Sequence, residues 1–130
     1  MKRAHPEYQR RILTADKTFR TTLFGLGWYA PHRVVANAAT QRWCHDDGPA
    51  KLAPRAINAC TGLLAKVSDR VTMPVVRMQT PSLPMFSPNA PTIGMPESAV
   101  ERTALYAGET VLRMTSVISA RQAVTDLAPR

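Results

Sequence analysis

The sequence lacks the short motifs by which many enzymes can be recognised. It contains no G-x-x-x-x-G-K-[ST] phosphate-binding loop, no G-x-G-x-x-G dinucleotide motif and no G-x-S-x-G nucleophile elbow. The histidines His5, His32 and His45 lie far apart in the sequence, and none has an obvious carboxylate to orient it. His32 follows a proline, which favours a cap or surface position at a helix start over a role as catalytic base. The motifs therefore assign no catalytic residue.

Cysteine is scarce, and long apolar runs are missing. Cys44 and Cys60 lack C-x-x-C spacing, which favours reduced, partly buried thiols over a disulfide. No run approaches about 18 apolar residues and no signal-peptide core is visible, so a cytoplasmic protein without a membrane span is predicted. Residues 44–47 offer potential metal ligands, but adjacent side chains point in different directions and no second cluster follows. A polar turn ending at Gly48 is predicted there instead of a metal site.

Aromatic residues make up only 6% of the chain, whereas 11 of its 130 residues are proline. One domain with an irregular portion is therefore expected. The formal charge of +8 is compatible with nucleic-acid binding, but the arginines are scattered and no aromatic RNA-binding pattern accompanies them. A basic background, or a segment whose acidic partner surface lies elsewhere, is favoured. A small basic nucleic-acid-binding or interaction module is the alternative.

Residues 98–127 carry the clearest structural signals, and two helices are predicted there. Ser98 and Glu101 have the spacing of a capping box, in which each side chain binds the other residue's backbone N–H, and Ser119 and Gln122 repeat it. Each helix has one apolar stripe. The stripes are Val100, Ala104, Ala107, Val111 and Met114 in the first helix and Ala120, Ala123, Val124 and Leu127 in the second.

Small residues are concentrated on the first of these helices, at Ala104, Ala107 and Gly108. They leave little side chain between the helix and its neighbour, so they suit close packing on a large flat surface such as a sheet or barrel. The rest of the chain is expected to supply hardly any surface of that kind.

Upstream, the sequence predicts three helices, at residues 6–13, 31–43 and 54–68, from their apolar spacing. Trp43 is expected to anchor the middle helix, and Ile57, Cys60, Leu64 and Val67 form the stripe of the last. Residues 18–24 alternate as a strand does, and one strand needs a partner edge. Prolines throughout residues 74–96 exclude helix and most sheet pairing, so an extended loop or a disordered tether is expected.

Five short segments also form an ordered pattern along the chain. They are H-P-E-Y…R-I-L at residues 5–13, K-T-F-R-T-T-L-F at 17–24, A-P-H-R-V-V-A-N…R-W at 30–43, A-L-Y-A-G-E-T-V at 104–111, and the final helix. In this order they resemble the C-terminal portion of the nitronate monooxygenase (2-nitropropane dioxygenase) family, with its D-T-x-R-T-x-x-F, P-x-R-V-x-x-N…W, L-Y-A-G-Q-S-V and A-A-E-I-V-x-x-L segments. Glu109 stands where glutamine is commoner, and residues 45–97 match poorly.

The resemblance implies an FMN-dependent (β/α)8 barrel that oxidises alkyl nitronates with dioxygen and uses a barrel histidine as base. The phosphate loops and that base would precede Met1. Residues 1–130 would then be a single incomplete domain, the C-terminal fragment of the barrel. It would comprise a helix–strand–helix cap at 4–44, a variable helix and proline-rich loop at 45–97 and a helical pair at 98–128.

By itself this chain is expected to be mainly helical with one short strand, to be inactive and to bind no FMN. A missing or separately encoded barrel segment is the implied partner. Tyr106 and Gly108, in the L-Y-A-G stretch, are the residues that the resemblance places nearest the flavin or substrate. Plain helix packing is the alternative role for both residues.

Overall fold

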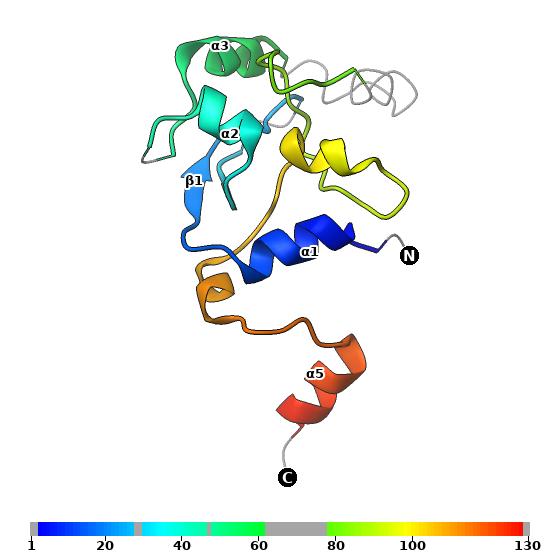
Figure 1. Ribbon diagram of the computed structural model, residues 1–130. Coiled ribbons are helices and arrows are strands. Elements are labelled where there is room, and N and C mark those ends of the chain that lie inside the picture. The colour runs from blue at the N-terminus through cyan, green and yellow to red at the C-terminus, as the bar shows by residue number, and fades with distance from the viewer. Residues whose placement is uncertain (1–2, 28–29, 47, 62–77, 129–130) are drawn as a thin grey trace.

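The computed structural model describes residues 3–27, 30–46, 48–61 and 78–128. Within them the chain is a mixed, mainly helical domain with four α-helices and a two-stranded antiparallel sheet, and these residues form no barrel (Figure 1). The elements, in order, are α1 (Pro6–Leu13), β1 (Phe19–Thr21), β2 (His32–Val34), α2 (Ala38–Trp43), α3 (Leu52–Cys60), the 3-10 helices η2 (Glu97–Glu101) and η3 (Glu109–Arg113), and α5 (Ala120–Leu127).

Helix α1 begins and ends where the sequence predicts. Pro6 occupies the first turn, where its missing N–H costs nothing, and the His5 ring accepts a hydrogen bond from the Glu7 N–H at 3.2 Å. Tyr8 is buried on the inner face of the helix. Arg11 pairs with Glu7 on the same helix and with Glu101.

The predicted strand 18–24 is confirmed for Phe19–Thr21, and its partner edge, which the sequence left unassigned, is a segment predicted to be helical. β1 pairs antiparallel with β2, with Phe19 opposite Val34 and Thr21 opposite His32. Residues 32–34 were predicted to begin a helix. They form a strand because β-branched Val34 packs well on a pleated surface and is fully buried there.

Helix α2 therefore begins at residue 38, after the Asn37 cap. The Asn37 side chain accepts from the Thr40 N–H, and the Thr40 hydroxyl accepts from the Asn37 N–H, which makes a reciprocal capping box. Trp43 anchors the other end, as expected: it packs against the main core, and its indole N–H donates to the Pro81 carbonyl at 2.8 Å.

Helix α3 begins at Leu52, two residues before the helix predicted for residues 54–68, and it faces the core differently from that prediction. Residues 62–68 of the prediction lie outside the described residues. Its buried residues are Pro54 and Asn58, and Cys60 is exposed. The Asn58 amide donates to the Thr22 and Leu23 carbonyls, so a polar contact sets the facing instead of the apolar stripe. Both cysteines are free thiols.

The proline-rich segment is a packed loop over its described part, residues 78–96. Phe86 is 0% exposed and meets Phe24 edge-on, at 5.6 Å between ring centroids. The loop also bonds to the start of the chain, where the His5 N–H donates to the Pro91 carbonyl. The extended-loop prediction is confirmed for these residues and the disordered tether is wrong, because Phe86 belongs to the core.

The helix predicted for residues 98–114 does not form. The segment is η2, then extended chain, then η3. The Glu101 carboxylate accepts from the Ala38 N–H instead of closing a box with Ser98. Leu105 is fully buried, and its carbonyl accepts from the Val35 N–H beside β2. This long-range pairing outweighs the local helical signals.

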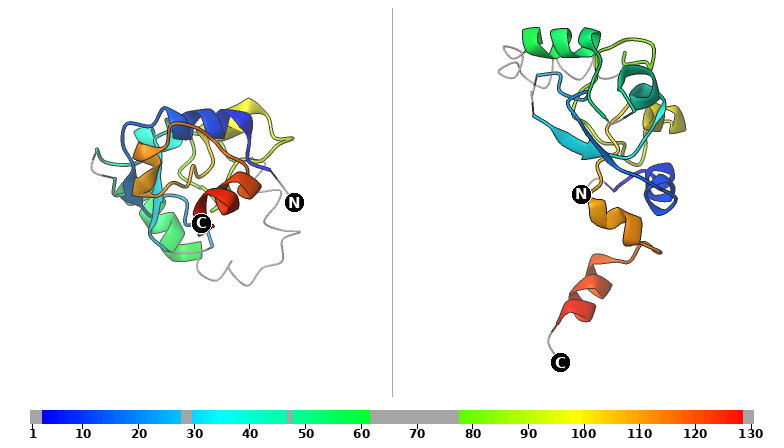
Figure 2. Two further views of the ribbon diagram at one scale, coloured as in Figure 1. Left: turned by 90° about the horizontal axis from the view of Figure 1, so that it is seen from below. Right: turned by 90° about the vertical axis from the view of Figure 1, so that its left-hand side faces the viewer.

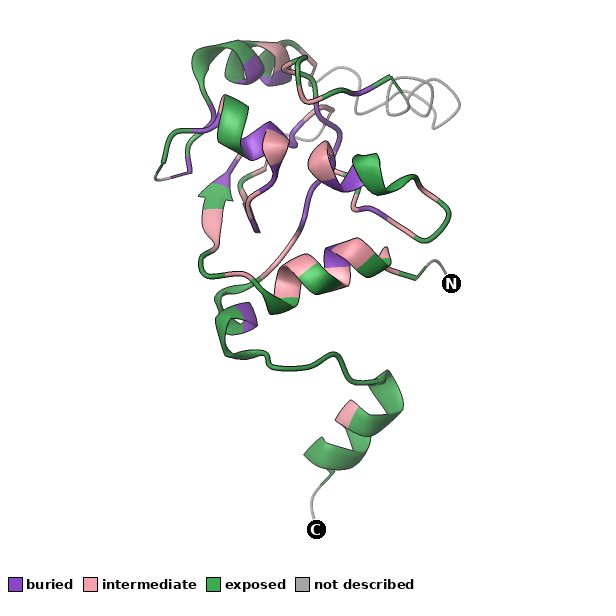
Figure 3. Ribbon diagram, viewed as in Figure 1, coloured by how far each residue is buried: buried purple, intermediate pink, exposed green. Residues whose placement is uncertain are grey.

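Two apolar clusters hold the fold together, and the C-terminus extends away from both. One cluster joins β1, β2, α2 and the proline-rich loop, and the other joins α1 to Val100 and Leu105. Beyond η3 the chain runs out to α5 (Figures 2 and 3). The Ser119 hydroxyl caps α5 by accepting from the Gln122 N–H, as predicted, but the Gln122 amide donates to Asp126 instead of closing the predicted capping box. Across the described ranges, no helix is long and apolar enough to cross a membrane.

Candidate functional site

Tyr106 is half-buried and lies on a third extended segment beside β2. An isolated antiparallel bridge pairs it with Val34, and the N–H of Ala107 donates to the Arg33 carbonyl at 3.1 Å. The Tyr106 hydroxyl donates to the Pro88 carbonyl at 2.8 Å, and the Tyr8 hydroxyl donates to the Tyr106 carbonyl at 2.6 Å. Burial raises the pKa of the Tyr106 phenol to about 12, which keeps it protonated as a donor.

The ring of His32 lies between those of Phe24 and Tyr106, at centroid distances of 5.8 and 5.6 Å. Its Nδ1 lies 2.9 Å from the Ala30 carbonyl, and because a carbonyl can only accept, Nδ1 carries the proton. Its buried Nε2 has no hydrogen-bond partner among the described residues. Burial lowers the pKa of the imidazole, so the neutral ring is favoured.

Sequence reasoning placed His32 at a helix surface and so missed this aromatic group. The usable signal was the alternation of His32, Arg33 and Val34, which suits a strand as well as a helix start. The structure brings His32 and Tyr106 together from positions 74 residues apart in the chain.

Gly108, the other predicted contact residue, lies away from this group at the N-terminus of η3 and is exposed. A Cβ there would meet only the Thr110 hydroxyl, at an ordinary 3.6 Å. Ala104 is fully buried in the main cluster, and Ala107 packs on the second one. This chain's own core thus covers Ala104 and partly covers Ala107, which corrects the expectation that the rest of the chain supplies hardly any surface for them, whereas Gly108 is not packed.

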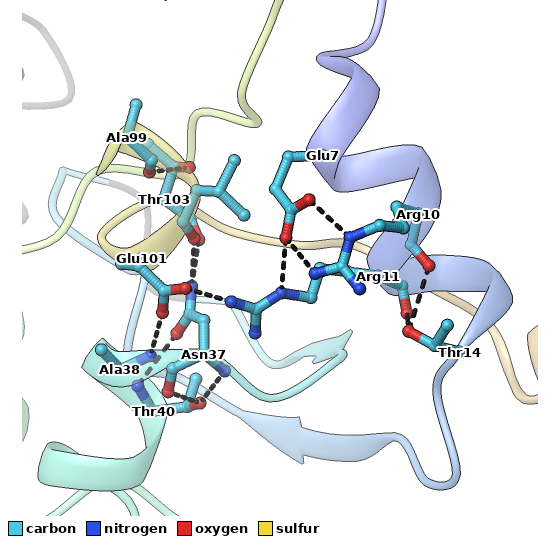
Figure 4. Close-up of polar contacts among 11 residues, drawn as sticks. Glu7, Arg10, Arg11, Thr14, Asn37, Ala38, Thr40, Ala99, Glu101 and Thr103 are labelled. Atoms are coloured by element: carbon cyan, nitrogen blue, oxygen red, sulfur yellow. Dashed lines mark hydrogen bonds and ion pairs between the residues drawn. The ribbon is translucent and has the colours of Figure 1, made fainter. Parts of the chain in front are cut away.

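A polar network around Asn37 holds the Tyr106 segment in place (Figure 4). Asn37 is 1% exposed, and its amide donates to the Val100 carbonyl at 2.9 Å and to the Thr103 carbonyl at 2.8 Å. The Glu101 carboxylate accepts from the Ala38 N–H at 2.8 Å and pairs with Arg11. Asn37 therefore caps α2 and fixes the approach to Tyr106. Sequence reasoning noted Asn37 only as part of a motif.

A pocket of about 130 Å³ opens beside α2 and contains neither Tyr106 nor Gly108. Its lining is Lys17, Phe19, Ala36, Thr40, Gln41, Cys44, His45 and Asp46. The buried Cys44 thiol lies 3.3 Å from the Thr21 hydroxyl, and burial raises its pKa, which makes it a poor nucleophile. In the described ranges, no three His, Cys, Asp or Glu side chains are grouped to hold a metal.

The pocket beside α2 is small for FMN. Cofactor pockets typically span about 300–1,000 Å³, and the pocket beside α2 is well below that. The Tyr106 hydroxyl donates to Pro88, and the Tyr106 carbonyl accepts from Tyr8, so both groups already have partners in this chain. No protein-family model, curated protein or solved structure matches the chain. The likeness to nitronate monooxygenases therefore depends on the ordered motif segments alone.

Proposed function

We propose that this chain is the C-terminal portion of a nitronate monooxygenase-like flavoprotein and acts together with a (β/α)8 barrel segment. The observation that carries the proposal is the convergence of the motif segments on one another. Segments that lie up to about a hundred residues apart form one hydrogen-bonded unit, as expected of parts kept together by a common site.

The convergence can be followed residue by residue. The K-T-F-R-T-T-L-F segment supplies β1, and the A-P-H-R-V-V-A-N segment supplies β2 and the Asn37 cap. Leu105 and Ala107 of the L-Y-A-G segment bond to Val35 and Arg33 on either side of Val34. Of the poorly matching residues 45–97, Leu52–Cys60 supply α3 at the periphery (Figure 1), whereas Phe86 of the proline-rich loop packs in the main core.

In this proposal the barrel segment holds FMN, which supplies the oxidation of the nitronate by dioxygen. In this proposal the described residues of this chain make a positional contribution. The network of Asn37, Tyr8 and Val35 holds residues 103–107 rigidly, and the exposed Gly108 follows directly. Gly108 and the adjoining turn are the part of the body that remains free to approach a cofactor held by the barrel.

A chimera tests the proposal. Residues 4–128 of this chain replace the corresponding C-terminal segment of a complete nitronate monooxygenase. The expected result is a protein with a stoichiometric flavin spectrum that consumes oxygen when an alkyl nitronate is added. The matched control carries Asn37→Ala, which should reduce both signals by releasing the 100–103 segment. A wild-type chimera that folds but contains no flavin and shows no nitronate-dependent oxygen uptake contradicts the proposal.

Nucleic-acid binding receives less support from the structure. Among the described residues, the exposed arginines are dispersed over the segment before α1, α1, β1, α2, α3, the 3-10 helix η3 and α5, so these arginines do not form one basic stripe. They are Arg3, Arg10, Arg20, Arg42, Arg55, Arg113 and Arg121. Any binding to DNA or RNA should therefore be weak and should disappear as salt rises to physiological concentration. Sequence-selective binding that persists at that salt would favour the alternative.

A further inference from the structure

The pocket beside α2 is separate from the Tyr106 group and has no part in the function proposed above. Its volume is about 130 Å³. Two of its lining residues are buried and two are half-buried, and these four form its interior: Thr40, Cys44, Phe19 and Ala36. The exposed lining residues form its mouth, and all of them are polar: Lys17, Gln41, His45 and Asp46. An interior with an aromatic ring and a methyl group, next to a few polar groups, is the usual composition of a small-molecule site.

The turn that follows α2 forms one wall of the pocket and is held firmly in place. The His45 N–H donates to the Pro49 carbonyl at 2.9 Å. Gly48 is buried at a φ of 109°, and a Cβ there would lie 2.7 Å from the Arg20 carbonyl oxygen. The turn therefore lies directly against β1. A wall that is already ordered before binding lowers the entropic cost of taking up a ligand.

The polar groups of the interior already have partners, whereas those of the mouth are open to a ligand. The Thr40 hydroxyl belongs to the capping box of α2. The Cys44 thiol lies 3.3 Å from the Thr21 hydroxyl. By contrast, the Lys17 ammonium and the Gln41 amide are exposed donors at the mouth. A ligand is therefore expected to place its polar end at the mouth and its apolar end inside.

The charges around the pocket favour an anionic ligand. Lys17 is at the mouth, and Lys51 lies near the interior, where its positive charge partly offsets the effect of burial on the pKa of the Cys44 thiol. The Lys51 ammonium is held there by a 2.8 Å hydrogen bond to the Arg42 carbonyl. Asp46 is the acidic residue of the mouth. Two ammonium groups against one carboxylate, in a chain of formal charge +8, attract anions.

We propose that the pocket beside α2 binds a small aliphatic monocarboxylate, with its carboxylate at Lys17 and its alkyl group against Phe19 and Ala36. An ammonium group binds a carboxylate through short, charge-assisted hydrogen bonds. The pocket has the volume of about four liquid waters, at about 30 Å³ each. That volume suits carboxylates of the size of acetate to butyrate. Inorganic anions match the charge, but they gain nothing from the ring and the methyl group.

Nuclear magnetic resonance of the full ¹⁵N-labelled chain tests this proposal. Propionate is added at constant ionic strength, and the backbone amide shifts are followed. The amides of residues 17–19 and 36–46 should shift saturably, with a dissociation constant of about 1–10 mM, because the ligand has few atoms. Propionamide, a neutral molecule of the same shape, and propylammonium, a cation, should each bind at least about tenfold more weakly.

Two variants that each remove one exposed positive charge provide the matched comparison. Lys17→Gln removes the ammonium at the mouth and should weaken propionate binding about tenfold or more. Arg20→Gln removes a charge from β1 outside the pocket lining and should change the affinity by less than about twofold. Both side chains are exposed, so both variants should keep the amide spectrum of the folded chain.

Four results would overturn the proposal. They are the absence of any saturable shift, shifts confined to amides outside the pocket, equal affinity for propionate and propionamide, and equal weakening by the two variants. Sulfate that reproduces the propionate shifts at the same ionic strength would likewise mean a general effect of anions. Each result leaves the flavin and oxygen signals of the chimera untouched, so this inference and the proposed function fail separately.

Discussion

The apolar side chains of the folded body, the described residues up to 111, are largely buried, whereas those of the C-terminal arm, residues 112–128, are exposed. In the body, short elements from distant parts of the sequence bury Phe24, Phe86 and Leu105 completely. In the arm, Val124 and Leu127 lie in water on a capped, regular helix. The body has short, irregular elements but buries its apolar side chains, and the arm contains a regular helix but leaves its apolar side chains exposed. Regular secondary structure is therefore a poor guide to which part of this molecule folds independently.

Limited proteolysis should show the largest contrast between the two regions. With a protease of broad specificity, residues 114–119 should be cut orders of magnitude faster than residues 78–96, because only the loop must leave a packed core to be cleaved. A disordered tether at residues 74–96, one of the two sequence-based expectations for that segment, would be cut first instead. Mass spectrometry of the earliest fragments decides between the two orders, and early cleavage near Phe86 would break the comparison.

Truncation of one large side chain in each region should follow the same division. Phe86→Ala removes a fully buried ring from the main core and should lower the free energy of unfolding by about 3–5 kcal/mol. Leu127→Ala, in the exposed arm, should change it by less than about 0.5 kcal/mol. Urea denaturation followed by tryptophan fluorescence measures both. Similar losses for the two variants would mean that the arm belongs to the cooperative unit.

The side-chain caps of α2 and α5 provide a subtler comparison. Asn37→Ala uncaps α2 and leaves the Val100 and Thr103 carbonyls without their donor, so it should cost about 2–3 kcal/mol. Ser119→Ala uncaps α5, where water replaces the lost contact, and global stability should not change. Its effect should appear as a small loss of helical circular dichroism. A large loss of global stability in Ser119→Ala would contradict the separation of arm from body.

Acid should weaken the body slightly, and the arm has no histidine to respond. Burial lowers the pKa of His32 in the folded chain, so its contribution to stability is complete above the unfolded pKa of about 6.5. That contribution is lost as pH falls from there through the lowered folded pKa. The melting temperature should therefore decline between pH 7 and 5 more steeply in the wild type than in His32→Phe, which keeps an aromatic ring beside Phe24. Equal slopes of melting temperature against pH in the two proteins would mean that His32 does not cause the loss of stability in acid.

Local signals in the sequence predicted the elements that depend on few distant contacts. Helix α1 and the Ser119 cap of α5 were predicted because proline position and capping chemistry act within one turn. The turn at Gly48 was predicted for the same reason, and its φ of 109° requires glycine.

The failures all involve residues whose partner lies far along the chain. Residues 98–114 carry a complete set of helical signals, yet burial of Leu105 beside β2 decides their conformation. His32 and Asn37 gained their roles in the candidate site from contacts with residues 63 or more positions away. Hydrophobic periodicity carries no information about such distant contacts. The sequence therefore pointed to Tyr106 as a candidate residue but did not predict which residues surround it.

The bond from the Tyr8 hydroxyl to the Tyr106 carbonyl also constrains how the chain reaches its native state. The two residues are 98 positions apart. The hydrogen bond from Asn37 to Val100 likewise cannot form until Val100, 63 positions later, has been synthesised. During synthesis α1 is made first, yet most of its buried contacts are made last. A topology dominated by contacts of such high sequence separation folds slowly. The body is thus expected to assemble after translation has passed η3, in a single late step instead of element by element.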